Sequence, residues 1–170
     1  MEQKKLIAVR MAHPLYGCID SSVMIKEYPV AASQYFYHAG ESFVYLASGL
    51  VTKAITNTAS FMGHAIVPVG RGAGASDAYW LSSATASADR LPIIVDINAR
   101  YLLPGIIPCT VAMIGGAWDI IAVNDGTLTH VDLDTSTTDV VVAVALGTEY
   151  GGGANDVVVK INPAKFQATT

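Results

Sequence analysis

Short apolar runs divided by turn-forming residues recur along the chain, and none of them keeps a helical period for three turns. Runs rich in Val, Ile, Tyr and Phe that are separated by Gly, Asn, Asp, Ser and Thr are typical of strands joined by turns. We predict strands over residues 42–46, 50–55, 61–69, 78–82, 92–97, 110–114, 119–123, 127–133, 140–146 and 156–161. This density of short strands indicates an all-β domain, either a compact β-barrel or a β-sandwich.

The order of the predicted strands repeats within the chain. Residues 42–49 (SFVYLASG) match residues 119–126 (DIIAVNDG) in pattern, and in both places an alternating strand, a turn-rich run, a mostly apolar strand and a closing strand follow. The pairs Ser48-Gly49 and Asp125-Gly126 suit tight turns, because glycine takes positive φ at little cost. We therefore predict two tandem meander-like repeats, about 39–98 and 117–162, folded around one core. The run 140–146 is apolar at every position, which predicts a strand covered on both faces.

The N-terminal part of the chain lies outside this repeat. Residues 1–38 carry few strand signals, so we predict an extended N-terminal arm over 1–38 that lies across a neighbouring subunit, and a β-rich core domain over 39–170. An arm of this kind predicts that trimming residues 1–30 weakens assembly and spares the β core.

The composition changes the expected surroundings of this fold. Only 14% of the residues are charged, against about 25% in an ordinary soluble domain. A domain of 170 residues needs charge to keep its surface in water, so part of the exterior is expected to be covered by other subunits or by a larger assembly. The net charge is −4 and the ten Lys and Arg are scattered, which argues against direct binding of nucleic acid.

Two uncharged stretches supply candidate interface residues. Residues 101–118 (YLLPGIIPCTVAMIGGAW) have the length of a membrane span, but Pro104 and Pro108 would break a helix, so we predict a buried or subunit-covered extended segment. Residues 29–40 hold three consecutive aromatic residues, for which anchoring of an interface and packing in the core are equally good interpretations. The candidate interface residues are Tyr35, Phe36, Tyr37, Leu102, Leu103, Ile106 and Ile107.

The glycine-rich segment 67–77 (VPVGRGAGASD) tests for a phosphate-binding loop. A loop of that kind needs a helix after its glycines, and a P-loop ends in Gly-Lys-Ser/Thr. Here a strand-like run with two aromatic residues follows and no lysine is present, while a second glycine-rich segment, 147–153 (GTEYGGG), fills the corresponding place in the second repeat. We interpret both segments as turns.

No other pattern predicts catalysis or metal binding. His13, His38, His64 and His130 are dispersed without metal-ligand spacing, and the chain has no G-x-S-x-G motif. The acidic cluster of Asp132, Asp134 and Asp139 lacks the glycine and the glutamate of an EF-hand, and we expect it to solvate a hairpin end and to form turn hydrogen bonds. Cys18 and Cys109 are isolated and fit buried thiols in a reducing compartment. We predict no catalytic residue, no cofactor and no metal, and hence no enzyme.

Three segments carry a resemblance to a known family. Residues 39–54 (AGESFVYLASGLVTKA), 61–65 (FMGHA) and 158–163 (VVKINP) are similar to the decoration, or cement, proteins of tailed-bacteriophage capsids, and the likeness covers about residues 39–165. The resemblance implies a head-stabilising structural protein that binds the outer surface of the capsid and bridges subunits of the major capsid protein. It also implies a homo-oligomer, with a trimer favoured over a dimer, which is made in the host cytoplasm and resides on the virion without contact to nucleic acid or membrane.

A carbohydrate- or receptor-binding β module is the alternative function. Such a module needs exposed aromatic residues beside polar ones, and the candidates are Tyr79 and Trp80 near Asp77, and Trp118 beside Asp119. A hydrolase or isomerase with a β-barrel core has no motif in its favour.

Overall fold

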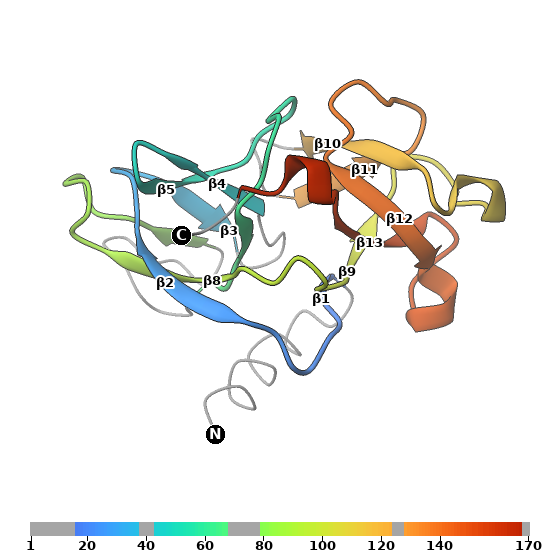
Figure 1. Ribbon diagram of the computed structural model, residues 1–170, viewed down its shortest axis with the longest axis horizontal. Coiled ribbons are helices and arrows are strands. Elements are labelled where there is room, and N and C mark those ends of the chain that lie inside the picture. The colour runs from blue at the N-terminus through green and yellow to red at the C-terminus, as the bar shows by residue number, and fades with distance from the viewer. Residues whose placement is uncertain (1–15, 38–42, 68–78, 124–127, 168–170) are drawn as a thin grey trace.

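Within residues 16–37, 43–67, 79–123 and 128–167, which the computed structural model describes, the chain is all-β, as the hydrophobic pattern predicts (Figure 1). The first sheet is antiparallel and has five strands, in the order β2 (Ile25–Pro29), β8 (Arg90–Ile94), β6 (Gly63–Ala65), β4 (Phe43–Ala47) and β5 (Leu50–Lys53). The second sheet is antiparallel and has six strands, in the order β1 (Gly17–Cys18), β9 (Tyr101–Pro104), β13 (Asp156–Ile161), β12 (Val141–Leu146), β10 (Ala117–Val123) and β11 (Leu128–Asp132). A separate ribbon consists of β3 (Tyr35–Tyr37) and β7 (Tyr79–Leu81).

Each of the two large sheets curls, so that strands far apart in its order come into contact. In the first sheet, the residue after β2, Val30, forms a parallel bridge with Val51 of β5, and the N–H of Ala31 donates to the carbonyl of Val51 at 3.0 Å. In the second sheet, Gly105 after β9 bridges Val131 of β11 in the same way, and the N–H of Ile106 donates to the carbonyl of Val131 at 3.1 Å. The six-stranded sheet is a curled half-barrel, and the five-stranded sheet closes through the same kind of contact.

The two halves of the chain therefore repeat one topology and lie side by side along the long axis of the molecule (Figure 1). Strands β2, β4, β5, β6 and β8 occupy the same relative places in their sheet as β9, β10, β11, β12 and β13 do in theirs. The predicted tandem repeat is confirmed, but each repeat begins one strand earlier than the sequence pattern indicates, at β2 and at β9.

The register within the repeat differs from the sequence match. Matching Gly49 to Gly126 would align Leu46 with Val123. In the structure Leu46 pairs with Val51, and Ile120 pairs with Val131, where Val51 and Val131 are the residues whose bridges close the two sheets. Leu46 therefore corresponds to Ile120, which lies three positions before Val123. The predicted turn at Ser48-Gly49 is confirmed, since both residues have positive φ (52° and 78°) between the paired residues of β4 and β5. The turn predicted at 125–126 lies outside the described residues.

The described part of the predicted arm belongs to the β structure. Residues 1–15 and 38 lie outside the described residues, but β1 pairs with β9, β2 pairs with β8, and β3 pairs with β7. Val30 is 1% exposed in the core of the first half. The extended arm is therefore wrong for residues 16–37, because long-range pairing, which leaves no local pattern, holds these short segments. Trimming residues 1–30 would remove a strand from the first sheet.

The strand predicted at 110–114 is also wrong. Val111–Met113 forms the 3-10 helix η1, in which the N–H of Met113 donates to the carbonyl of Thr110 at 3.0 Å and that of Ile114 to Val111 at 3.2 Å. Gly115 follows with φ of 88° and turns the chain into β10. The backbone thus forms its hydrogen bonds locally here. The other 3-10 helices are η2 (Gly147–Tyr150) and η3 (Pro163–Lys165).

The buried apolar residues form two clusters and not the single predicted core. One cluster fills the first sheet, with Val44, Val51 and Ile93 among its members. The other fills the second sheet and includes residues such as Phe43 and Ile94, which point outward from the first sheet. The outer face of the first half thus packs into the interior of the second, and this packing joins the halves.

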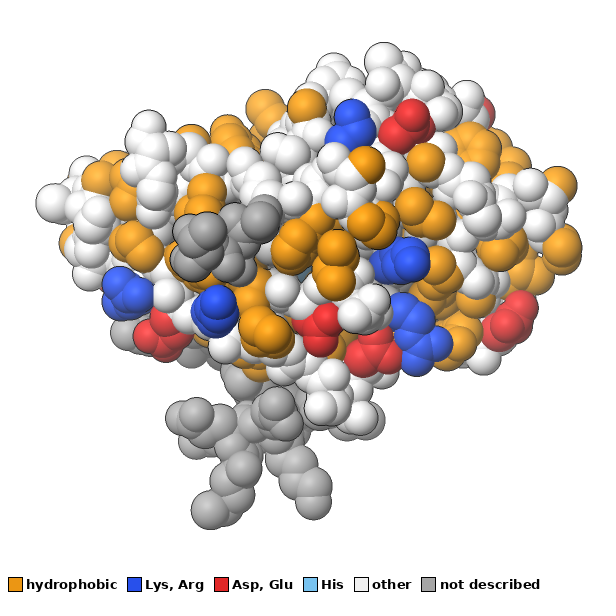
Figure 2. All heavy atoms as spheres, viewed as in Figure 1, with side chains coloured by type: hydrophobic (Ala, Val, Ile, Leu, Met, Phe, Trp, Pro, Cys, Tyr) orange, Lys and Arg blue, Asp and Glu red, His pale blue; other side chains and the backbone are white. Residues whose placement is uncertain are grey.

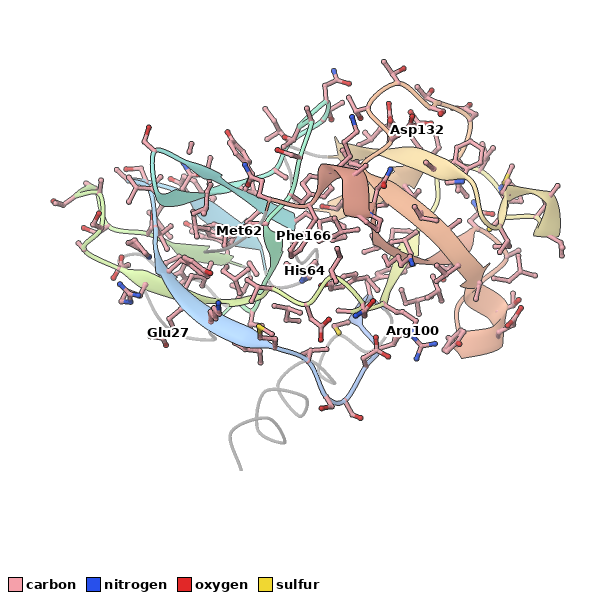
Figure 3. All side chains as sticks on the ribbon, viewed as in Figure 1. Glu27, Met62, His64, Arg100, Asp132 and Phe166 are labelled. Atoms are coloured by element: carbon pink, nitrogen blue, oxygen red, sulfur yellow. The ribbon has the colours of Figure 1, made fainter. Side chains whose placement is uncertain are left out.

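Aromatic rings and the C-terminal segment occupy the junction between the halves. Phe43 stacks on Phe61 at a centroid distance of 4.9 Å, and His64 stacks on Tyr101 of the second half at 4.8 Å. Figure 3 shows His64 and Phe166 between the two halves. The N–H of Phe61 donates to the carbonyl of Lys165 at 2.9 Å, so the end of the second repeat pairs with the first.

A lid covers the interior of the first half. The ribbon of β3 and β7 extends from the loops after β2 and before β8, and its Phe36 and Trp80 are 0% and 2% exposed within the first core. In the second half, the corresponding loops after β9 and before β13 form η1 and η2 and no ribbon. The interior of the first half is therefore covered by its own loops, whereas the interior of the second half is covered largely by residues of the first half.

Candidate interaction surface

The structure places the seven candidate interface residues in different environments. Phe36, Leu102 and Leu103 are at most 3% exposed and are buried within this chain, so they offer no surface to a partner. The alternating pattern places them against the core or beneath neighbouring segments. Ile107 is half-buried and packs against the second core. Two of the seven are exposed, Tyr35 at 44% and Ile106 at 38%, and the side chain of Tyr37 lies outside the described residues.

Other large apolar side chains are exposed that the sequence pattern did not single out. Val111 of η1 is 74% exposed, the most among the large apolar residues of the described chain, and Tyr150 of η2 is 41% exposed. Together with Ile106 they lie on the loops that, in the first half, carry the lid. The absence of charge between residues 101 and 117 was the signal that could have located this region.

The two tryptophans that were candidates for a glycan-binding site pack within the chain. Trp80 is 2% exposed inside the first core. The indole N–H of Trp118 donates to the carbonyl of Met113 at 3.2 Å, and its ring packs against the second core. The carboxylate of the neighbouring Asp119 binds backbone groups, and Asp77 lies outside the described residues. A sugar ring would find no exposed indole at Trp80, and the half-buried indole of Trp118 and the carboxylate of Asp119 are engaged within the chain.

The predicted acidic cluster forms turn hydrogen bonds, since the hydroxyl of Ser136 donates to Asp139 at 2.5 Å and the N–H of Asp134 donates to Asp132 at 3.4 Å. Asp119, which the prediction did not include, forms more of them. Asp119 of β10 is 4% exposed, and its carboxylate accepts the N–H groups of Thr138 and Asp139 at 2.7 Å each and that of Thr137 at 3.1 Å. Burial alone would raise its pKa, but these donors outweigh burial and hold the pKa of Asp119 below the ordinary value. Asp119 therefore fixes the loop between β11 and β12 as a carboxylate.

Asp132 lies directly opposite Asp119 in the pairing of β10 with β11, but its environment shifts the pKa of its carboxyl group in the opposite direction. Burial, followed by the neighbouring Asp134, raises the pKa of Asp132 above its ordinary value. Figure 3 places Asp132 and Arg100 on opposite edges of the second half, so Arg100 does not compensate the charge of Asp132.

His130 and Asp156 form a second polar group beside the end of β9. Asp156 is 6% exposed and accepts the N–H of Gly153 at 2.7 Å and the hydroxyl of Tyr16 at 3.3 Å. Burial lowers the pKa of His130, and the attraction of Asp156 offsets this in part. His130 is therefore neutral at pH 7, and Asp156 serves to hold the loop before β13.

Arg100 ties three segments together at the surface. Its guanidinium binds the carboxylate of Asp20 at 2.7 Å and the hydroxyl of Tyr150 at 2.9 Å, and its backbone N–H donates to Asp20 at 2.6 Å. Because both charged side chains are partly exposed, this ion pair contributes about 1 kcal/mol or less.

Among the residues that the structure describes, no group of three His, Cys, Asp or Glu side chains is arranged to hold a metal ion. Cys18 and Cys109 are half-buried, and burial raises the pKa of the Cys109 thiol. His13, His38 and the glycine-rich segment 68–77 lie outside the described residues, whereas His64 is fully buried at the junction.

In the described ranges no helix has the length and hydropathy needed to span a membrane. Residues 101–118, which have the length of a span, form β9, η1 and the start of β10.

Comparison of the chain with protein-family models, curated proteins and solved structures found no match.

Proposed function

We propose that this protein is a structural component of a tailed-phage virion, which binds the outer surface of the capsid and stabilises it by bridging subunits of the major capsid protein. It acts as a homo-oligomer, with a trimer favoured, and transforms no substrate. The resemblance of residues 39–54, 61–65 and 158–163 to capsid decoration proteins suggests this class of function.

The observation that carries the proposal is the apolar, weakly charged exterior. Charged residues are 14% of the chain, and large apolar side chains such as Met24, Ile55 and Val111 are more than half exposed. Figure 2 shows hydrophobic side chains spread over the visible face, with the few charged ones mostly along one edge. A domain with so few charged residues on its surface is expected to be covered by a partner in its working state.

The two closed halves fit this role. Each core is buried within the chain, and the buried carboxylates of Asp119 and Asp156 hold loops in place. A rigid body with a low-charge surface can bridge neighbouring shell subunits without rearrangement, so little binding energy is lost to ordering. The glycan-binding alternative has less support, because both of its candidate tryptophans are engaged within the chain.

Binding to undecorated capsids tests the proposal. Purified protein is mixed with empty heads assembled from the major capsid protein of the same phage, and the mixture is sedimented. We expect saturable co-sedimentation and a higher temperature of capsid disruption in the presence of the protein. A monomer that stays in the supernatant at every concentration would refute the proposal.

A further inference from the structure

The outer face of strands β9 and β13 carries a pair of apolar side chains that is buried. Leu102 of β9 pairs with Val158 of β13. The residues directly before and after each of them belong to the second core, and side chains alternate along a strand, so Leu102 and Val158 point to the opposite face of the sheet. They are nevertheless 3% and 0% exposed, and they belong to neither of the two core clusters. Another part of the molecule therefore lies over them.

The first half supplies a comparison, because it repeats the same topology. The residues that form the closing bridges, Val30 and Gly105, occupy equivalent positions. Three residues earlier, Glu27 takes the place of Leu102, and Pro92, its partner in β8, takes that of the partner of Leu102. Glu27 is exposed and Pro92 is half-buried. At this place the first half thus carries a charged residue in solvent, and the second half carries a covered apolar pair.

The neighbouring strands do not provide this cover. In the same row, Gly17 of β1 lies beside Leu102, and Ala145 of β12 lies beside Val158. Glycine has no side chain and alanine has a single methyl group, so neither reaches over the larger side chain next to it. The cover is therefore expected from a segment that crosses the outer face of the sheet.

The chain enters this face at its first described residue. The hydroxyl of Tyr16 donates to Asp156 at 3.3 Å, and Asp156 lies two residues before Val158 on the same face of β13. Tyr16 therefore reaches across β9 from the side of β1. The fifteen residues before Tyr16 include the apolar run 6–9 (LIAV). An extended chain of fifteen residues spans up to about 50 Å, whereas β9 and β13 lie about 5 Å apart, so this segment is long enough to cover both side chains.

We propose that residues 1–15 are the cover of this apolar pair, and that the segment lies over the outer face of β9 and β13 with its apolar run on Leu102 and Val158 of its own chain. The inference does not depend on the proposed function. It places the first fifteen residues of the predicted N-terminal arm on their own subunit and not across a neighbouring one.

A second copy of the chain is a poorer occupant. The segment is joined to Tyr16, and Gly17, the next residue, already pairs with Leu102. Such a tether holds the segment at an effective concentration in the millimolar range at the face of its own chain. A segment from another copy would have to displace it at the lower concentration of free protein.

Deletion of residues 2–12, combined with alanine substitutions of two adjacent leucines, tests the proposal. Leu102→Ala shortens a side chain on the outer face, and Leu103→Ala shortens an equally buried one, 2% exposed, in the second core. Each substitution is made in the full-length protein and in the shortened one, and the midpoint of thermal unfolding, Tm, is measured by circular dichroism.

We expect the deletion alone to lower Tm by at least about 5 °C, because it exposes the apolar pair. Leu102→Ala should lower Tm by about 5–10 °C in the full-length protein and by less than about half as much in the shortened one, where the side chain is already exposed. Leu103→Ala should have the same effect in both proteins within about 2 °C, because its surroundings do not include the segment.

Each outcome has a distinct meaning. If Leu102→Ala has the same effect with and without residues 2–12, the segment does not cover this face and the proposal is wrong. If both leucine substitutions lose their effect in the shortened protein, the deletion disrupts the second half as a whole and the assignment to the outer face is wrong. If the deletion changes the elution volume in gel filtration, the segment covers another copy and the named occupant is wrong. If Leu102→Ala does not fold, Val158→Ala, a smaller truncation in the same pair, decides in its place.

Discussion

Two aspartates that face each other across one hairpin, Asp119 and Asp132, are expected to affect stability in opposite directions. Asp119 accepts three backbone N–H groups, two of them at 2.7 Å, while Asp132 is buried beside a second carboxylate, that of Asp134. Hydrogen bonds to a charged group contribute about 1.5–3 kcal/mol each, but the loop is partly exposed and water can replace part of this. We therefore expect Asp119→Ala to lower the free energy of unfolding by about 3 kcal/mol at pH 7.

The isosteric variants separate charge from shape. Asp119→Asn keeps one acceptor oxygen and loses the charge, so we expect a loss of about 1–2 kcal/mol at pH 7. Asp132→Asn removes an unfavourably buried charge and keeps an acceptor for the N–H of Asp134, so we expect no loss and a gain of up to about 1 kcal/mol. Urea unfolding followed by tryptophan fluorescence measures both variants against the wild type.

The pH dependence follows from the directions of the two pKa shifts. The pKa of Asp119 is lower in the folded state than the ordinary value of 3.8, so its stabilisation is present above that value and is lost as pH falls through the folded pKa. The pKa of Asp132 is higher in the folded state, so its destabilisation is present at neutral pH and is relieved as pH falls through the raised pKa. The difference between wild type and either variant should thus shrink as the pH is lowered from neutral through these two pKa values. Equal effects of the two Asn variants at pH 7 would refute this reasoning.

Three further predictions test the lid, the first sheet and the buried histidine. Trp80→Ala should lower the free energy of unfolding by about 3–5 kcal/mol, whereas Tyr35→Ala in the same ribbon, 44% exposed, should cost less than about 1 kcal/mol in urea unfolding. Gly63→Ala should abolish soluble expression or cost more than about 3 kcal/mol, because its Cβ would overlap the carbonyl oxygen of Ile94 in β8; Gly49→Ala, in open space at φ of 78°, should cost about 1 kcal/mol. Burial lowers the folded pKa of His130, so stability should fall as pH drops below about 6.5, and His130→Gln should reduce that slope; an unchanged slope would contradict the prediction.

Local pattern was sufficient for the fold class and for the existence of the repeat. Alternation and β-branched runs depend on the two faces of a single strand, so they predict strands such as 42–46 and 140–146 without reference to distant residues. The turn at Ser48-Gly49 is likewise local, because positive φ at glycine is a property of one residue. The leading strand β2 was missed, and β9 was predicted only as an extended segment outside the repeat, because both are held by pairing with β8 and β13, far along the chain.

By itself the sequence determined an all-β chain with two tandem repeats and little charge. Tertiary structure alone decided which apolar residues remain outside. Phe36 and Leu102 are buried and Val111 is exposed, although all three lie in uncharged stretches. It also decided that Asp119 and Asp132 have opposite pKa shifts. The physical reason is that burial and electrostatic environment depend on the neighbours that folding brings from distant positions, whereas strand and turn propensity depend on neighbours along the chain.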